Sequence, residues 1–110
     1  MRHIIPIAKP FFKNEEIEAV KSVMKSGFLV QGEKVKAFED EFARYIGVKN
    51  AVAVANGTIA LDIALKALEI HQGDEVVTPA FSFVASANCI LYQRAKPVFA
   101  DIDKRTFNID

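Results

Sequence analysis

Three short runs of residues carry groups that could bind a small molecule. The first, Asn56-Gly57-Thr58, follows a run of small apolar residues at 51–55 and precedes apolar residues at helical spacing. A glycine turn between a strand and a helix leaves backbone N–H groups free beside the positive end of the helix dipole, where phosphate binds well. The Thr58 hydroxyl would be a further donor. The spacing alone favours an ordinary turn with Thr58 as the helix N-cap, because a single Gly-Thr pair is a weak signal.

The other two runs lie where further strands are expected to end. Phe81 and Phe83 follow the second strand, at the carboxyl edge where open α/β sheets bind ligands. Either ring could stack on a planar cofactor, although core packing is the better interpretation for either ring taken alone. Asp101 and Asp103 follow the third strand and could bind a cation, but the formation of a turn is the favoured interpretation.

The composition excludes several classes of function. Among 110 residues, 14 basic and 14 acidic side chains give a net charge of zero, so nothing favours binding to nucleic acid or to an anionic membrane. The chain has one cysteine, Cys89, so an intramolecular disulfide is excluded, and we predict that Cys89 is a small buried residue of a helix. The sequence contains two histidines and shows no cluster of metal ligands. No signal peptide and no apolar run of about 18 residues is present, so we expect a cytoplasmic protein.

Alternating strands and helices are expected to position these residues. We predict strands at residues 51–55, 75–79 and 96–102, the first of them buried on both faces. One helix begins near Thr58, and another follows the junction at residues 80–83 and ends near Tyr92. The predicted fold class is α/β, with a mostly parallel sheet and flanking helices.

Two more helices are predicted before the first strand. An extended arm, residues 1–13, precedes a helix with Asn14 as its N-cap and Gly27 at its C-terminal end. A loop closed by Gly32 leads into a second helix that ends at Gly47. These helices cannot cover both faces of a buried three-stranded sheet, so we expect a part of a larger protein or a protein that needs a partner.

An ordered set of motifs over essentially the whole chain resembles the DegT/DnrJ/EryC1/StrS family of pyridoxal-phosphate-dependent sugar aminotransferases. Any one motif is weak, and the specificity lies in their order and spacing. The motifs are Ile5-Pro6-Ile7, Ser26-Gly27, Gly32 with Val35-x-x-Phe38-Glu39, Tyr45-x-Gly47, Ala55-Asn56-Gly57-Thr58-x-Ala60-Leu61, Gly73-Asp74-Glu75-Val76 and Thr78-Pro79-x-Phe81-x-Phe83-Val84-Ala85.

The resemblance implies a cofactor, pyridoxal 5'-phosphate (PLP), and places three groups of residues. Gly57 and Thr58 match the family's phosphate-binding turn, and Phe83 matches the aromatic residue that stacks on the pyridine ring. A loop that comes near the active site, often across a dimer, corresponds to Gly27, Phe28 and Gly32. Family members transfer an amino group, here expected from glutamate, to a nucleotide-linked keto-sugar, and a homodimer is implied.

The resemblance places the catalytic residues elsewhere. The Schiff-base lysine, a serine near it and the acid that pairs with the pyridine nitrogen are expected beyond Asp110, so residues 1–110 carry no catalytic residue and correspond to the N-terminal portion of the large domain of a fold-type I enzyme. We expect these residues to be inactive alone, because the lysine and the acid are both needed for the chemistry of the cofactor.

Two alternatives remain open. Some family members replace the lysine with histidine and dehydrate the sugar, and nothing in residues 1–110 separates them from the aminotransferases. A short, non-catalytic α/β module could instead bind a partner or a phosphorylated ligand through Gly57 and Thr58. A Rossmann-type dinucleotide binder is disfavoured because the chain has no Gly-x-Gly-x-x-Gly motif.

Overall fold

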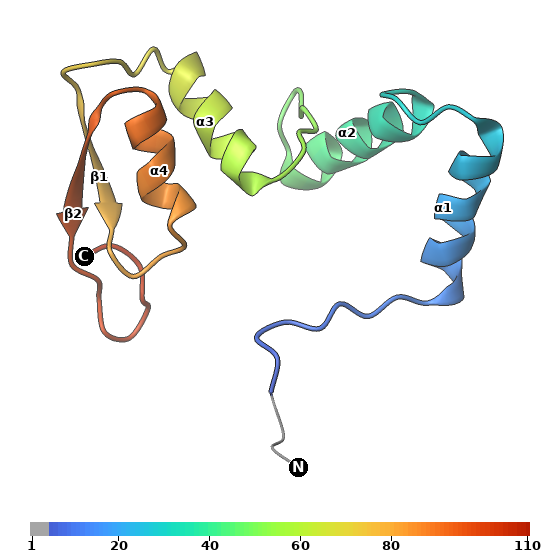
Figure 1. The fold of residues 1–110 in the computed structure, drawn as a ribbon, viewed down its shortest axis with the longest axis horizontal. Coiled ribbons are helices and arrows are strands. Elements are labelled where there is room, and N and C mark those ends of the chain that lie inside the picture. Colours follow the sequence, from blue (N-terminus) through green and yellow to red (C-terminus); the bar gives the residue numbers. More distant parts are fainter. Residues whose placement is uncertain (1–4) are drawn as a thin grey trace. The chain divides into compact units, whose positions relative to one another are not determined.

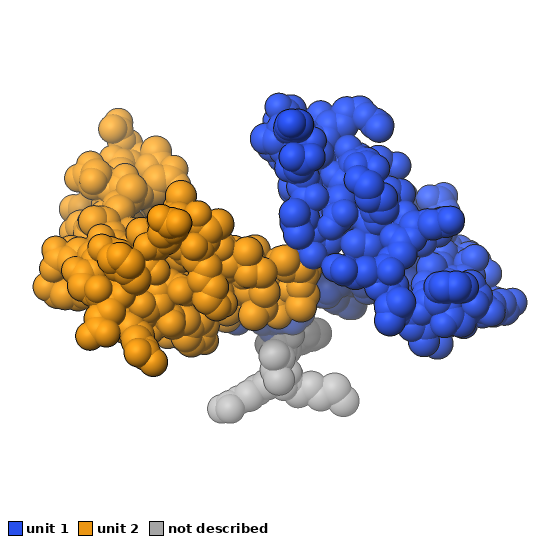
Figure 2. Space-filling view, turned by 90° about the horizontal axis from the view of Figure 1, so that it is seen from above, with its two compact units in different colours: residues 1–53 blue, residues 54–110 orange. Residues whose placement is uncertain are grey.

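The structure is a computed structural model in which residues 5–110 are described. Its chain divides into two units, residues 1–53 and residues 54–110, which are coloured separately in Figure 2. Each unit is described by itself below. In the described residues, no helix has the length and apolar character that crossing a membrane requires.

The first unit contains two helices, α1 (Asn14–Ser26) and α2 (Glu33–Ile46). The N-cap of α1 is Lys13, whose backbone N–H donates to Glu16 Oε2 at 2.6 Å. The prediction of Asn14 as the N-cap was therefore wrong by one residue, because the carboxylate of Glu16 satisfies the N–H group of Lys13. Both helices end as predicted at a glycine with left-handed backbone, Gly27 at φ 74° and Gly47 at φ 81°.

The apolar stripes of α1 and α2 are largely open to solvent. Val20 on α1 is 61% exposed and Phe38 on α2 is 57% exposed, and Ala43 is the single buried residue among the described residues of both helices. Glu39 accepts a hydrogen bond of 2.9 Å from the Ala53 N–H and so holds the segment after α2 against that helix. Residues 5–13 form neither helix nor strand.

The second unit is built on a parallel pair of strands. In chain order it contains α3 (Gly57–Ala67), β1 (Glu75–Pro79), α4 (Ala85–Tyr92) and β2 (Lys96–Ala100). The strands pair in parallel from Glu75 opposite Lys96 to Pro79 opposite Ala100. Helix α4 connects the strands and packs against both of them and against α3 (Figure 1). This arrangement confirms the predicted α/β class with a parallel sheet.

The sheet is smaller than predicted. Residues 51–55 pair with no strand in the described part of the chain, so the predicted first strand was wrong. A run of apolar residues indicates burial, whereas a strand also requires a neighbour that shares its backbone hydrogen bonds. Strand β2 ends at Ala100 rather than at Ile102, which instead forms an isolated antiparallel bridge with Ile109.

The core of the second unit lies around α4. Cys89, Ile90 and Ala95 are at most 5% exposed and form one buried cluster. Cys89 is thus the small buried helix residue that was predicted. Three partly buried side chains complete the cluster, one from α3, one from the turn after it and one from β1: Leu65, Ile70 and Val76.

Candidate functional site

The start of α3 is fixed by Asn56. This residue has extended backbone, and its side-chain Oδ1 accepts a hydrogen bond of 3.1 Å from the Ile59 N–H. Its carbonyl accepts the Ala60 N–H at 3.1 Å. Asn56 is therefore the N-cap, and the interpretation of Thr58 as the N-cap was wrong, because Thr58 is already inside the helix.

This cap leaves two backbone donors free. The first turn of a helix has N–H groups without intrahelical partners, and here Asn56 satisfies that of Ile59. No protein hydrogen bond uses the N–H groups of Gly57 and Thr58 within the described residues. Two adjacent N–H groups at the positive end of α3 can therefore donate hydrogen bonds to a bound anion.

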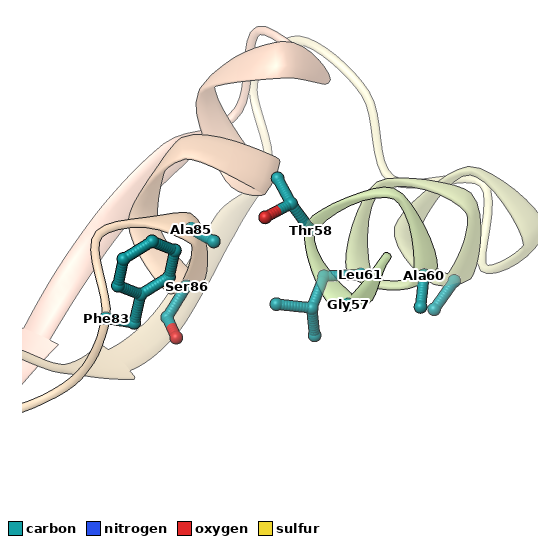
Figure 3. A pocket seen from close by; sticks show the side chains of 8 residues that line it. Gly57, Thr58, Ala60, Leu61, Phe83, Ala85 and Ser86 are labelled. Atoms are coloured by element: carbon teal, nitrogen blue, oxygen red, sulfur yellow. The ribbon is translucent and has the colours of Figure 1, made fainter. Parts of the chain in front are cut away.

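A cavity of about 720 Å³ opens beside these donors (Figure 3). Gly57 lines the cavity, and a Cβ atom built on it would meet nothing within 4 Å, so open space surrounds the residue. Thr58 is half-buried, and its side chain lies on the α3 side of the cavity, across from the residues that start α4 (Figure 3). The cavity is lined by Gly57, Thr58, Ala60, Leu61, Ala64, Phe83, Ala85 and Ser86.

The opposite wall comes from the turn before α4. Phe83 is 75% exposed, and its ring is free to contact a ligand in the cavity. Its carbonyl accepts a hydrogen bond of 2.9 Å from the Ser86 N–H, which holds the backbone of the turn. The hydroxyls of Ser82 and Ser86 lie 2.8 Å apart in a hydrogen bond. Ser86 was not singled out from the sequence, because one serine near a helix start has no distinguishing pattern.

The second aromatic residue lies elsewhere. Phe81 lines a separate cavity of about 400 Å³ with Asp101 and Ile102, and its ring is 5.8 Å from that of Phe107. The structure therefore brings Phe83, but not Phe81, to the cavity that contains Gly57 and Thr58.

Two aspartates follow β2, and the second of them holds a turn. Asp103 accepts hydrogen bonds from the N–H groups of Arg105 and Thr106 at 2.9 and 2.8 Å. These bonds, that of Thr106 first, hold the pKa of Asp103 below its ordinary value of 3.8. Asp101 accepts the N–H of Ile102 at 2.8 Å. The favoured interpretation as a turn former is confirmed for Asp103, whereas the Asp101 side chain bonds the N–H of the next residue and closes no turn.

The predicted loop residues belong to the first unit. Phe28 is 78% exposed, and its N–H donates to Ser26 Oγ at 3.2 Å. Gly27 ends α1, and Gly32 is the N-cap of α2. These three residues stand outside the set that lines the cavity.

One polar link joins the helices that border the cavity, and sequence reasoning missed it. The buried Gln93, at the C-terminal end of α4, donates through Nε2 to Asp62 Oδ1 on α3 at 2.5 Å. Lys66, one turn after Asp62, donates to the other carboxylate oxygen at 2.8 Å. The hydrogen bond from Lys66 is the main cause that lowers the pKa of Asp62, and that from Gln93 adds to it.

Comparison with known proteins gives the family. The profile of the DegT/DnrJ/EryC1/StrS aminotransferase family matches residues 10–110. The chain belongs to this family. Its relatives include the spore coat polysaccharide biosynthesis protein SpsC of Bacillus subtilis, 49% identical over 108 residues. That match covers 98% of this chain and 28% of SpsC.

Solved structures of similar proteins share the fold. Spr1654 of Streptococcus pneumoniae, assigned as a sugar aminotransferase and solved in its PLP form, has a TM-score of 0.89 and 34% identity, covering 98% of this chain and 28% of that one. A GDP-4-keto-6-deoxymannose-3-dehydratase with a trapped PLP-glutamate geminal diamine has a TM-score of 0.87 and 33% identity, covering 96% and 29%. The chain thus spans under a third of these proteins, and the predicted fold, a partial fold-type I aminotransferase domain, is confirmed.

Proposed function

We propose that residues 1–110 form the N-terminal part of the large domain of a PLP-dependent enzyme that transfers an amino group from glutamate to a nucleotide-linked keto-sugar. The observation that carries the proposal is the single cavity that joins the free N–H groups of Gly57 and Thr58 to the exposed ring of Phe83. The family of the chain and its similarity to a solved sugar aminotransferase support it.

The residues present fit a phosphate on a planar ring. Two free N–H groups, the Thr58 hydroxyl and the positive end of α3 suit a dianionic phosphate. The absence of a Cβ at Gly57 leaves room for close approach. A cavity of about 720 Å³ falls within the range that holds small molecules.

In this proposal each residue has one task. Gly57 and Thr58 hold the phosphate, and Phe83 stacks on the ring and excludes water from one face. Once bound, the cofactor supplies an electron sink for chemistry at the carbon that carries the amino group. We assign no catalytic residue to residues 1–110, and the Schiff-base lysine belongs to the portion of the relatives that this chain does not span.

Further features of the whole protein are part of the proposal. We infer a homodimer in the cytoplasm, with the loop that holds Gly27, Phe28 and Gly32 near substrate or the partner subunit. The family resemblance of this loop supports that role, and the exposure of Phe28 leaves its ring free for such a contact.

A sugar dehydratase is the second candidate, favoured by one comparison. The GDP-4-keto-6-deoxymannose-3-dehydratase is about as similar to this chain as the sugar aminotransferase Spr1654, at 33% and 34% identity. Both reactions would use the same phosphate seat, the N–H groups and hydroxyl of Gly57 and Thr58, and the same aromatic ring, that of Phe83. These residues therefore suit either reaction.

The test uses the natural gene product that contains these residues. Titration with PLP should give a saturable absorbance change. Incubation with glutamate and a nucleotide-linked keto-sugar should then yield an amino-sugar, by mass spectrometry, in amounts that match the 2-oxoglutarate formed. Loss of the sugar hydroxyl without gain of nitrogen would support the dehydratase. Absence of any PLP binding would reject both and leave the non-catalytic module.

A further inference from the structure

Helices α3 and α4 form the two walls of the cavity, so their relative position sets its width. The start of α3 contributes Gly57 and Thr58, and the start of α4 contributes Ala85 and Ser86, directly after Phe83 (Figure 3). The phosphate seat and the aromatic ring therefore stay at a constant spacing only if the two helices keep their register.

Apolar packing and one polar contact join the two helices. Leu65 of α3 packs against the cluster of Cys89, Ile90 and Ala95, and such apolar contacts have no preferred direction. The hydrogen bond from Gln93 to Asp62 is, among the described residues, the one side-chain hydrogen bond between α3 and α4. It is directional, it ends on a charged oxygen, and its donor is buried, so it constrains both helices.

From this geometry we infer that Asp62 and Gln93 are positioning residues that hold the Gly57–Thr58 seat at the correct distance from Phe83. The inference rests on the proposed function, since it concerns the phosphate of the same cofactor. Neither residue lines the cavity, and so neither would touch the ligand.

The charge on Asp62 has a second partner that supplies a matched control. Lys66 contacts the other carboxylate oxygen, is 60% exposed and lies on the same helix as Asp62. Removal of Lys66 changes the charge around Asp62 but leaves the connection to α4 in place. A role in positioning therefore requires a large effect at Gln93 and a small one at Lys66.

The experiment compares two probes, PLP and pyridoxal, on the natural gene product that contains these residues. Gln93→Leu should weaken PLP binding about tenfold, by analogy with the loss of partners that orient metal ligands. It should leave pyridoxal binding nearly unchanged, because pyridoxal has no phosphate. Lys66→Met should leave both affinities unchanged. The double variant Asp62→Asn with Gln93→Glu should restore part of the PLP binding, because the hydrogen bond between residues 62 and 93 can form with donor and acceptor exchanged, whereas the bond from Gln93 Nε2 to the Cys89 carbonyl is lost.

A purely structural role gives a different pattern. It would lower the melting temperature while the ratio of the PLP and pyridoxal affinities stayed that of the unmodified protein, and this result would overturn the inference. If Gln93→Leu does not fold, Gln93→Asn, whose amide is one methylene too short to reach Asp62, takes its place. Failure of the unmodified protein to bind PLP would reject the proposed function itself, whereas normal binding with unaffected Gln93 variants would reject only the positioning role.

Discussion

Gly57 and Phe83 line the same cavity, one as the first residue of α3 and the other in the turn that leads into α4. The first offers a free N–H group without a side chain, and the second offers an exposed aromatic ring. A ligand that satisfies both must carry an anionic group at one end and a flat apolar surface near it.

Gly57→Ala tests the phosphate seat by filling it. The new methyl group would meet no protein atom within 4 Å, so the fold should keep its thermal stability or gain slightly from alanine's higher helix propensity. PLP affinity should fall about tenfold or more, because loss of one hydrogen bond to a charged group costs about 1.5–3 kcal/mol. Calorimetric titration and thermal melts separate the two effects. Unchanged affinity would place the phosphate elsewhere.

Thr58→Val removes the hydroxyl and keeps the shape of the side chain. We expect PLP binding to weaken by about 10- to 100-fold, corresponding to about 1.5–3 kcal/mol for a hydrogen bond to a charged acceptor. Thr58→Ser retains the hydroxyl and serves as the control, with affinity close to that of the unmodified protein. Equal affinities of the valine and serine variants would show that the hydroxyl makes no contact with the ligand.

Phe83→Leu tests the stacking surface. Loss of the aromatic face should weaken PLP binding about 2- to 10-fold, because such contacts contribute about 0.5–1.5 kcal/mol beyond apolar burial. The matched control is Phe81→Leu, since Phe81 lines the other cavity and contacts Phe107 instead. If the Phe81 variant binds PLP more weakly than the Phe83 variant, the assignment of the ring is wrong.

Asn56→Ala tests the cap that leaves the two donors free. The Ile59 N–H would lose its acceptor, and the free energy of unfolding of α3 should fall by about 1 kcal/mol, as for other N-caps. Hydrogen exchange of the amides in the first turn of α3 measures this effect locally. Asn56→Ser can still accept the hydrogen bond and should behave like the unmodified protein.

Asp103 gives the turn after β2 a defined pH dependence. Its pKa in the folded state is below 3.8, so the ionised carboxylate stabilises the turn fully above the unfolded value, and the effect is lost as the pH falls through the lowered pKa. The amide resonances of Arg105 and Thr106 should report this transition by NMR. Its midpoint should lie below that of an unstructured peptide of residues 101–110, and Asp103→Asn should abolish it. Equal midpoints would contradict the hydrogen-bonded turn.

The sequence predicted elements whose ends have local signals. Strand β1 was predicted at its observed bounds, and Gly27 and Gly47 marked the ends of α1 and α2. Prediction from the sequence failed where an element forms only if a segment distant in the chain pairs with it. Residues 51–55 have the composition of a buried strand but no neighbour to pair with in the described residues.

The candidate site shows the same limit. Family motifs singled out Gly57, Thr58 and Phe83, and the structure brings all three to one cavity. The Asp62–Gln93 hydrogen bond was invisible, because an aspartate and a glutamine in separate helices form no pattern along the chain. The true cap, Asn56, was missed because both Asn56 and Thr58 are good cap residues and the sequence did not distinguish them.

The connection of β1 to β2 through α4 has a consequence for how the protein is made. Every element that lines the main cavity or packs against α4 lies between Gly57 and Ala100, so the chain closes only short loops to form it. Parallel pairing of β1 with β2 must wait until α4 has been synthesised, because the crossover helix lies between the two strands in the chain. All elements around the cavity are therefore present in the growing chain once Ala100 has been added.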